Sequence, residues 1–238
     1  MKLSQRNTPR GFTLIDFMVI VALVVVLVGV AFPRFTKSNA PGSKISCMNN
    51  LKQVGLAFRF WALDHNDKSP TEVSVTNGGA MEAVMAGNVA AVFQVMSNEL
   101  STPKLLFCPE DRRRRQAVTF FKAAPAGRPN QITYFSNNSN VSYFVGLDAT
   151  NASPSMLLSG DDNWLVGGEA RNVAYKGVPV RSGILALWTN TPVAWSEARH
   201  DRNGNVGLAD GSVQGFSSRR LAEALRNTGV ATNRLAFP

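Results

Sequence analysis

The chain has 238 residues and a formal net charge of +9, and 45% of its residues are hydrophobic against 17% charged. This length suits a single globular domain with an anchor, and the composition favours a folded, loop-rich protein over a disordered one. The basic excess is compatible with contacts to anionic lipid headgroups or nucleic acid, although an excess of this size usually only keeps a protein soluble.

An apolar run, FTLIDFMVIVALVVVLVGVAF, covers residues 12–32 and carries one charge, Asp16. A helix of this length measures roughly 31 Å at about 1.5 Å per residue, which matches the hydrocarbon core of a membrane. We therefore predict a transmembrane helix over residues 12–32. Because Lys2, Arg6 and Arg10 precede the run, the positive-inside rule places the rest of the chain outside the inner membrane.

The residues at the two ends of the run distinguish between kinds of export signal. An ordinary secretory signal has small residues at its far end, whereas here Ala31-Phe32 end the run and Pro33 follows it. A glycine, Gly11, stands immediately before the run. Cleavage at this glycine would remove residues 1–11 as a leader peptide and leave the helix attached.

The segment Arg10-Gly11-Phe12-Thr13-Leu14-Ile15-Asp16 resembles the cleavage and methylation signature of type IV prepilins and type II secretion pseudopilins. The resemblance implies that prepilin peptidase cuts after Gly11 and methylates the new amine of Phe12. That family normally has glutamate at the position of Asp16. A carboxylate in a membrane is costly unless it is paired, so we expect Asp16 to pair with the amine of a neighbouring subunit; a charge that snorkels to the interface is the alternative.

After the span, Pro33 and Pro41-Gly42 delimit a predicted kinked connector over residues 33–43. A helix is predicted over residues 44–65, because apolar residues recur there at spacings of four and three and line one face. These residues are Cys47, Leu51, Val54, Phe58 and Trp61. The face should pack against a sheet, within a globular head over residues 44–238.

The chain has two cysteines, Cys47 and Cys108. A disulfide between them would close about 60 residues and stabilise the fold by roughly 4 kcal/mol in the chain-entropy model. An exported head makes such a bridge plausible, and two buried free thiols are the alternative. Because there are only two histidines, four-ligand zinc chemistry is poorly supported and no metal site is expected.

The rest of the head is predicted to be α+β with an antiparallel sheet. Residues 81–100 favour a helix interrupted near Gly87-Asn88, and residues 218–227 favour a short helix. Short runs bounded by Asn, Gly or Pro predict strands. These runs cover residues 105–107, 132–135, 141–145, 156–158 and 183–188.

Segments of the head also resemble one pilin-like family that is common in bacteria. They are residues 45–57, 107–109, 142–148, 159–163 and 200–213. In the last of these, His200 is followed by nine residues and then Asp210-Gly211, the H-x9-D-G mark of that subgroup. Asp210-Gly211 also predicts a tight hairpin turn, because glycine adopts positive φ readily. A turn without chemistry is the simplest interpretation.

Candidate chemistry is sparse. The sequence has no G-x-S-x-G elbow and no H-E-x-x-H motif, so we expect no enzyme activity. Asp161, Asp162 and Asp210 are weak candidates for calcium, although their spacing does not match an EF-hand loop; no other cofactor is expected. A basic run could contact nucleic acid or a neighbouring subunit, with Phe120-Phe121 nearby for stacking. It comprises Arg112, Arg113, Arg114 and Arg115.

Together these features predict a pilin-like protein in which the transmembrane helix continues, with a break, into an amphipathic helix packed on the head. The resemblance implies a structural subunit of a type II secretion pseudopilus or a type IV pilus-like filament. Its expected partners are other subunits, prepilin peptidase, an inner-membrane assembly platform and membrane lipid. The head is expected in the periplasm or on a cell-surface filament. The alternative is a membrane-tethered protein that binds DNA or another ligand through its head.

Overall fold

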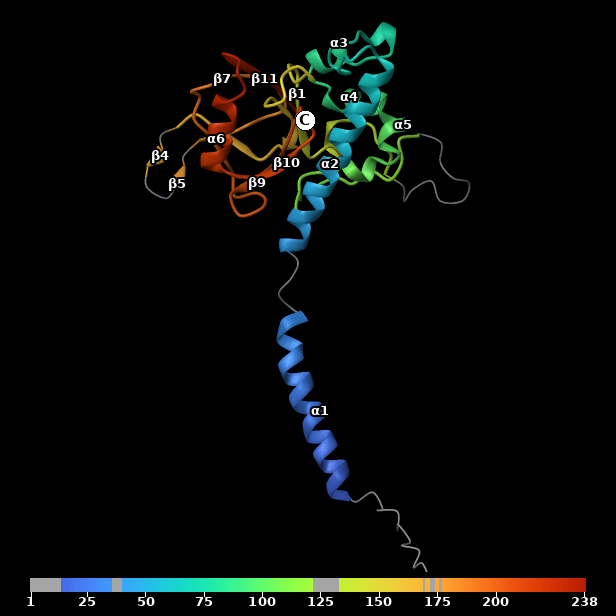
Figure 1. Cartoon of the computed structure of the whole chain (residues 1–238), viewed down its shortest axis with the longest axis vertical. Helices are drawn as coiled ribbons and strands as arrows, with labels where there is room; N and C mark the ends of the chain where they lie inside the picture. Colours follow the sequence, from blue (N-terminus) through green and yellow to red (C-terminus); the bar gives the residue numbers. More distant parts are fainter. Residues whose placement is uncertain (1–13, 36–39, 122–132, 169, 172–173, 176) are drawn as a thin grey trace, which may run out of the picture. The chain divides into compact units, whose positions relative to one another are not determined.

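The computed structural model describes residues 14–35, 40–121, 133–168, 170–171, 174–175 and 177–238 (Figure 1). The chain divides into two compact units, Met1–Pro41 and Gly42–Pro238. Each unit is described by itself, the first as the N-terminal unit and the second as the head.

The N-terminal unit contains the helix α1, Leu14–Phe35. The side chains of residues 14–27 are exposed, and almost all of them are apolar. Asp16 lies in the first turn of this helix. Within the described part of the chain, no helix is both long enough and apolar enough to cross a membrane. The span over residues 12–32 therefore stays a prediction, and Gly11 and Phe12 lie outside the described residues.

Most of the helix α2, Ala40–Asp64, belongs to the head. Its predicted apolar face is buried along its whole length, from Cys47 at 0% exposure to Trp61 at 2%. The predicted interruption within residues 81–100 is also present, because Gly87 has a φ of 86° and the Asn88 side chain accepts a hydrogen bond from the N–H of Ala91. The short helices are η1 Val75–Asn77, α3 Met81–Met85, α4 Val89–Val95, α5 Ser97–Leu100, η2 Pro103–Leu106 and η3 Asn138–Asn140.

The main sheet of the head has six strands in the order β10-β9-β2-β1-β11-β7, and all neighbours pair antiparallel. Its strands are β1 Tyr143–Gly146, β2 Leu157–Asp161, β7 Gly183–Trp188, β9 Asn203–Leu208, β10 Val213–Ser217 and β11 Thr232–Phe237. A second sheet has the order β6-β3-β8, with β3 Trp164–Val166, β6 Val178–Pro179 and β8 Val193–Trp195. The strands β4 Ala170–Arg171 and β5 Ala174–Tyr175 form a two-stranded ribbon.

The central strands β1 and β2 are buried on both faces, and successive side chains of a strand point to opposite faces. On β1, Val145 joins the hydrophobic cluster that contains the α2 residues Phe58 and Trp61. The preceding residue, Phe144, joins a second cluster with Trp164 of β3 and the helix α6, Ser218–Arg226. Figure 1 accordingly shows α2 and α6 on opposite sides of the strands. The head therefore has three layers.

Two predicted strands differ from the structure. Residues 105–107 do not form a strand: Pro103 begins the 3-10 helix η2, and the Thr102 side chain caps it by accepting a hydrogen bond from the N–H of Lys104. Of the run 132–135, the described residues 133–135 contribute one isolated bridge, between Thr119 and Tyr134. The C-terminal strand β11 was not predicted, yet it pairs with both β1 and β7.

The hairpin of β9 and β10 turns at Asp210-Gly211, where Gly211 has a φ of 83°. A second glycine of this hairpin, Gly204, lies against the indole ring of Trp195. A Cβ atom at Gly204 would lie 2.4 Å from that ring. The first strand of the hairpin therefore depends on a glycine for close packing against the three-stranded sheet.

Candidate functional site

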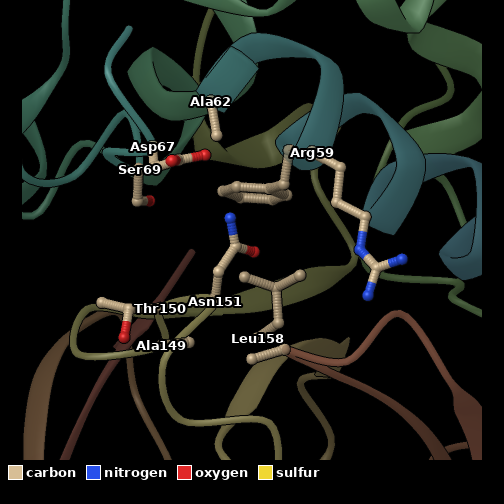
Figure 2. Close-up of a pocket in the computed structure, with 10 residues that line it drawn as sticks. Arg59, Ala62, Asp67, Ser69, Ala149, Thr150, Asn151 and Leu158 are labelled. Atoms are coloured by element: carbon tan, nitrogen blue, oxygen red, sulfur yellow. The ribbon is translucent and has the colours of Figure 1, made fainter.

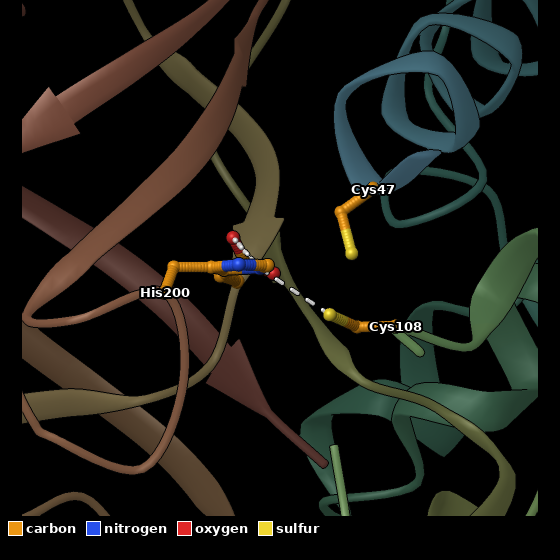
Figure 3. Close-up of side chains that lie close together, drawn as sticks. Cys47, Cys108 and His200 are labelled. Carbon is orange, nitrogen blue, oxygen red and sulfur yellow. Dashed lines mark hydrogen bonds and ion pairs between the residues drawn. The ribbon is translucent and has the colours of Figure 1, made fainter. Parts of the chain in front are cut away.

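Four side chains with metal-ligating or nucleophilic atoms converge inside the head. Cys47, Cys108, Asp161 and His200 are all buried, and one donor atom from each lies within 4.8 Å of every other. Figure 3 shows the two sulfur atoms and the imidazole ring directed toward a common region. The four side chains are called the buried cluster below.

The sheet register explains why distant residues meet in the buried cluster. Tyr143 of β1 pairs with Asp161 of β2, and Gly160 of β2 pairs with Val206 of β9. The start of β1, the end of β2 and the start of β9 therefore lie at one end of the sheet. His200 precedes β9, and Asp161 is the last residue of β2. Cys47 reaches the same place from the buried face of α2.

His200 lies beside Glu110. The Glu110 Oε2 atom lies 2.9 Å from His200 Nδ1 and accepts the backbone N–H of His200 at 2.7 Å. The other ring nitrogen, Nε2, lies 3.3 Å from Cys108 Sγ and 3.6 Å from Asp161 Oδ2. Nδ1 of His200 therefore faces Glu110, and Nε2 faces Cys108 and Asp161.

The turn that presents His200 has an uncommon backbone. His200, Asp201 and Arg202 have φ values of 53°, 50° and 60°, all in the left-handed region. Non-glycine residues there cost of order 1–3 kcal/mol each and tend to gather at functional sites. Two hydrogen bonds from Asn203 close the turn, one to the carbonyl of His200 at 3.1 Å and one to that of Asp201 at 2.9 Å.

Asp161 is supported by Asn205 and Arg199. The backbone N–H and side-chain amide of Asn205 donate to Asp161 Oδ2 at 2.7 and 3.0 Å. The Arg199 side chain is 1% exposed and lies 3.7 Å from Asp161 Oδ1 and 3.4 Å from Asp111 Oδ2. It also pairs with Asp162. A buried cation therefore sits beside the cluster and offsets several carboxylates.

The pKa values of the two cysteines move in opposite directions. A hydrogen bond with Cys47 lowers the pKa of Cys108 to about 6, and a hydrogen bond with His200 adds to this effect. The same bond with Cys108, together with burial, raises the pKa of Cys47. Burial alone would lower the pKa of His200, but its hydrogen bond with Cys108 and the charges of Asp161 and Glu110 raise it. The shared hydrogen bond therefore lowers the pKa of Cys108 and raises that of Cys47.

The basic run at residues 112–115 is partly engaged within the head. Arg113 and Arg114 donate to Asp162 at 2.8 and 2.9 Å, and Arg114 also donates to the carbonyl of Pro238 at 2.7 Å. Arg112 and Arg115 are exposed. Of the two phenylalanines proposed for stacking, Phe120 is buried, and Phe121 is 69% exposed. Nucleic-acid binding stays a prediction, for which the two outer arginines are the more accessible.

The three aspartates considered for calcium lie in different environments. Asp161 belongs to the buried cluster. Asp162 is not a member of that cluster and pairs with Arg114 and Arg199. The Asp210 carboxylate accepts the N–H of Ser212 at 2.7 Å, and its carbonyl accepts a hydrogen bond from Arg59. These contacts give Asp210 a local role in the hairpin turn.

The residues singled out from the sequence are only partly brought together. Cys47, Cys108 and His200 meet, and Asp161 joins them. The two cysteines are free thiols in this structure, so the disulfide stays a prediction. The Asp16 side chain is exposed on α1. The sequence did not reveal that these four side chains meet. The ligands of known short metal motifs are much closer in sequence than Cys108 and His200, which are 92 positions apart.

A small cavity lies elsewhere in the head, next to α2. Arg59, Asp67, Asn151 and Leu158 are among its lining residues (Figure 2). Its volume is about 30 Å³, which is room for about one water molecule. It is therefore too small to be a binding site for an organic ligand, and the buried cluster is the stronger candidate site.

The described residues form an apolar N-terminal helix and an α+β head with an antiparallel sheet. Such a head is compatible with a pilin-like protein. The sequence is 27% identical over 70 residues to a ComG operon protein 3 homolog of Bacillus licheniformis. These residues make up 29% of this chain and 72% of that protein. The similarity supports a type IV pilin-like relationship. No family model matches the sequence, and no solved structure gives a significant match.

Proposed function

We propose that this chain is a non-enzymatic structural subunit of a type IV pilus-like filament or a type II secretion pseudopilus, assembled through its N-terminal helix. The observation that carries this proposal is the apolar surface of α1. Large apolar side chains are exposed all around its described part: Leu14, Ile15, Phe17, Met18, Val19, Ile20, Val21, Leu23, Val24, Val25, Val26 and Leu27.

A helix that is apolar all round is stable in lipid or among other apolar helices, not in water. Among the described residues, the hydrophobic clusters of the head are built from residues of the head. The similarity to the ComG operon protein 3 homolog supports a pilin-like filament subunit. In this proposal α1 anchors the subunit in the membrane and packs against other subunits, and the head lies outside the membrane.

The proposal includes maturation at the inner membrane. Prepilin peptidase would cut after Gly11 and expose an ammonium group on Phe12, leaving the head in the periplasm and α1 available to the assembly platform. In the apolar interior of a filament, the carboxylate of Asp16 on one subunit would neutralise that ammonium group on the next. Asp16 would thereby set the axial register of the subunits.

The substitution Asp16→Ala tests this pairing. Loss of the carboxylate leaves an ammonium group without a counter-ion in an apolar layer, and each 1.4 kcal/mol lost reduces an association constant about tenfold. We expect the assembled fraction to fall by at least about tenfold, measured by shearing filaments from cells and quantifying the chain. Cleavage after Gly11 should continue.

Two matched variants interpret that experiment. Asp16→Glu keeps the charge and should assemble, whereas Gly11→Ala should accumulate the uncleaved chain. If Asp16→Ala filaments form at the wild-type yield, the pairing does not exist, although a filament built by α1 packing alone would remain. If neither Asp16→Ala nor the wild type assembles with any pilin-like partner, the proposed function is wrong.

A further inference from the structure

We propose that the buried cluster is a structural zinc site, with Cys47 Sγ, Cys108 Sγ, one carboxylate oxygen of Asp161 and Nε2 of His200 as its four ligands. This site goes beyond the proposed function and does not depend on it. It would connect α2, the loop after η2, the end of β2 and the turn before β9.

The spacing of the four donor atoms suits tetrahedral zinc. Zinc lies about 2.3 Å from sulfur and about 2.0–2.2 Å from nitrogen or oxygen, so neighbouring ligand atoms are roughly 3.3–3.8 Å apart. In the head, Nε2 of His200 is 3.3 Å from Cys108 Sγ and 3.6 Å from Asp161 Oδ2. All four atoms lie within 4.8 Å of one another. Small side-chain shifts would complete the tetrahedron.

The groups behind the ligands have the arrangement that zinc sites use. A metal-bound histidine commonly donates its second N–H to a carboxylate, which fixes the tautomer. Glu110 occupies that position, 2.9 Å from His200 Nδ1. Asn205 orients Asp161 through two hydrogen bonds. Asp161 is therefore held by hydrogen bonds before any ion binds, and His200 already has a carboxylate beside its second ring nitrogen.

The charge of the cluster also fits a divalent cation. Two thiolates and one carboxylate would carry three negative charges in a buried place, and a zinc ion would neutralise two of them. The Arg199 guanidinium, which also pairs with Asp111 and Asp162, lies 3.7 Å from Asp161 and offsets part of the third charge. Burial makes this balance important, because an uncompensated charge in the interior is strongly unfavourable.

The ligand types select zinc over calcium or magnesium. Those two ions prefer oxygen ligands in larger or octahedral shells, whereas two thiolates and one imidazole suit a softer tetrahedral ion. With four protein ligands, no position is left open for a substrate. The ion would therefore stabilise the head and not perform catalysis.

The experiment uses the full chain, purified in detergent with its thiols reduced, and measures bound zinc per chain after dialysis. We expect about one zinc per chain. His200→Asn should weaken binding at least tenfold, and Glu110→Gln should weaken it about 10–100-fold, the range for residues that orient a ligand. His65→Asn is the matched control, because His65 stacks on Trp61 outside the cluster. This variant should bind zinc like the wild type.

Cobalt substitution in the wild-type chain keeps the proposal testable if the variants do not fold. Bound Co²⁺ should show a thiolate-to-metal charge-transfer band and the intense visible bands of tetrahedral coordination. Less than a tenth of an equivalent of zinc in the wild type, or a cobalt spectrum without the thiolate band, would overturn the proposal. So would wild-type affinity in a folded His200→Asn variant, or a Cys47–Cys108 disulfide in protein from its native source.

Discussion

The substitution Arg199→Met destabilises the head by about 3–5 kcal/mol, the expected cost of removing one partner from a buried ion pair. The Arg199 side chain is 1% exposed, and it is the buried cation beside Asp111, Asp161 and Asp162. Its Nη1 atom also donates to the carbonyl of Ser142 at 3.1 Å. Methionine would fill much of the volume and leave these carboxylates without their buried counter-charge.

The free energy of unfolding is measured by urea titration of the full chain in detergent, followed by tryptophan fluorescence, with a chelator present. Arg234→Met is the matched control, since Arg234 also pairs with an aspartate, Asp148, but its side chain is 49% exposed. An exposed pair contributes at most about 1 kcal/mol. An Arg199→Met variant as stable as the Arg234→Met variant would show that the buried ion network does not stabilise the fold.

The second large effect is expected at Trp164, which is 1% exposed and central to the aromatic packing between the two sheets. The centroid of its ring lies 5.3 Å from that of Phe144 and 5.6 Å from those of Trp195 and Phe237. Its indole N–H donates to the carbonyl of Asp161 at 2.9 Å. Trp164→Ala should therefore cost about 3–5 kcal/mol through the cavity and the lost contacts.

The matched control for this prediction is Trp188→Ala on β7, because Trp188 is 62% exposed. Exposed substitutions usually change stability by no more than about 0.5 kcal/mol. The same urea titration compares the two variants. Equal unfolding midpoints for Trp164→Ala and Trp188→Ala would mean that the aromatic cluster between the sheets is not the second core of the head.

Local periodicity allowed part of the fold to be predicted. The face of α2 follows from apolar residues at helical spacing, and β1, β2 and β7 follow from short apolar runs between turn residues. β11 was missed because its sequence, TNRLAF, begins with three polar residues. The strand β3 has only three residues and β6 only two, which is too short for a pattern to be detected. At residues 105–107, the local effect of Pro103 outweighed an apolar run.

The buried cluster could not be predicted, for a different reason. Cys47, Cys108, Asp161 and His200 come from four distant segments, and the register of β1, β2 and β9 brings them together. A sequence pattern reveals which face of a strand is apolar, but it does not reveal which strands are neighbours. The resemblance to the H-x9-D-G subgroup marked His200 as notable without indicating what it contacts. The buried cluster thus depends on contacts between segments that are far apart in the sequence.

As the proposed pilin-like subunit, the chain would keep its apolar helix after its leader is removed. Mass spectrometry of the intact protein recovered from membranes tests this claim most directly. The proposal predicts a mature chain that begins at Phe12 and carries one methyl group on its amine. A chain that still begins at Met1, or one that begins beyond Phe32 and has lost the helix, would contradict it.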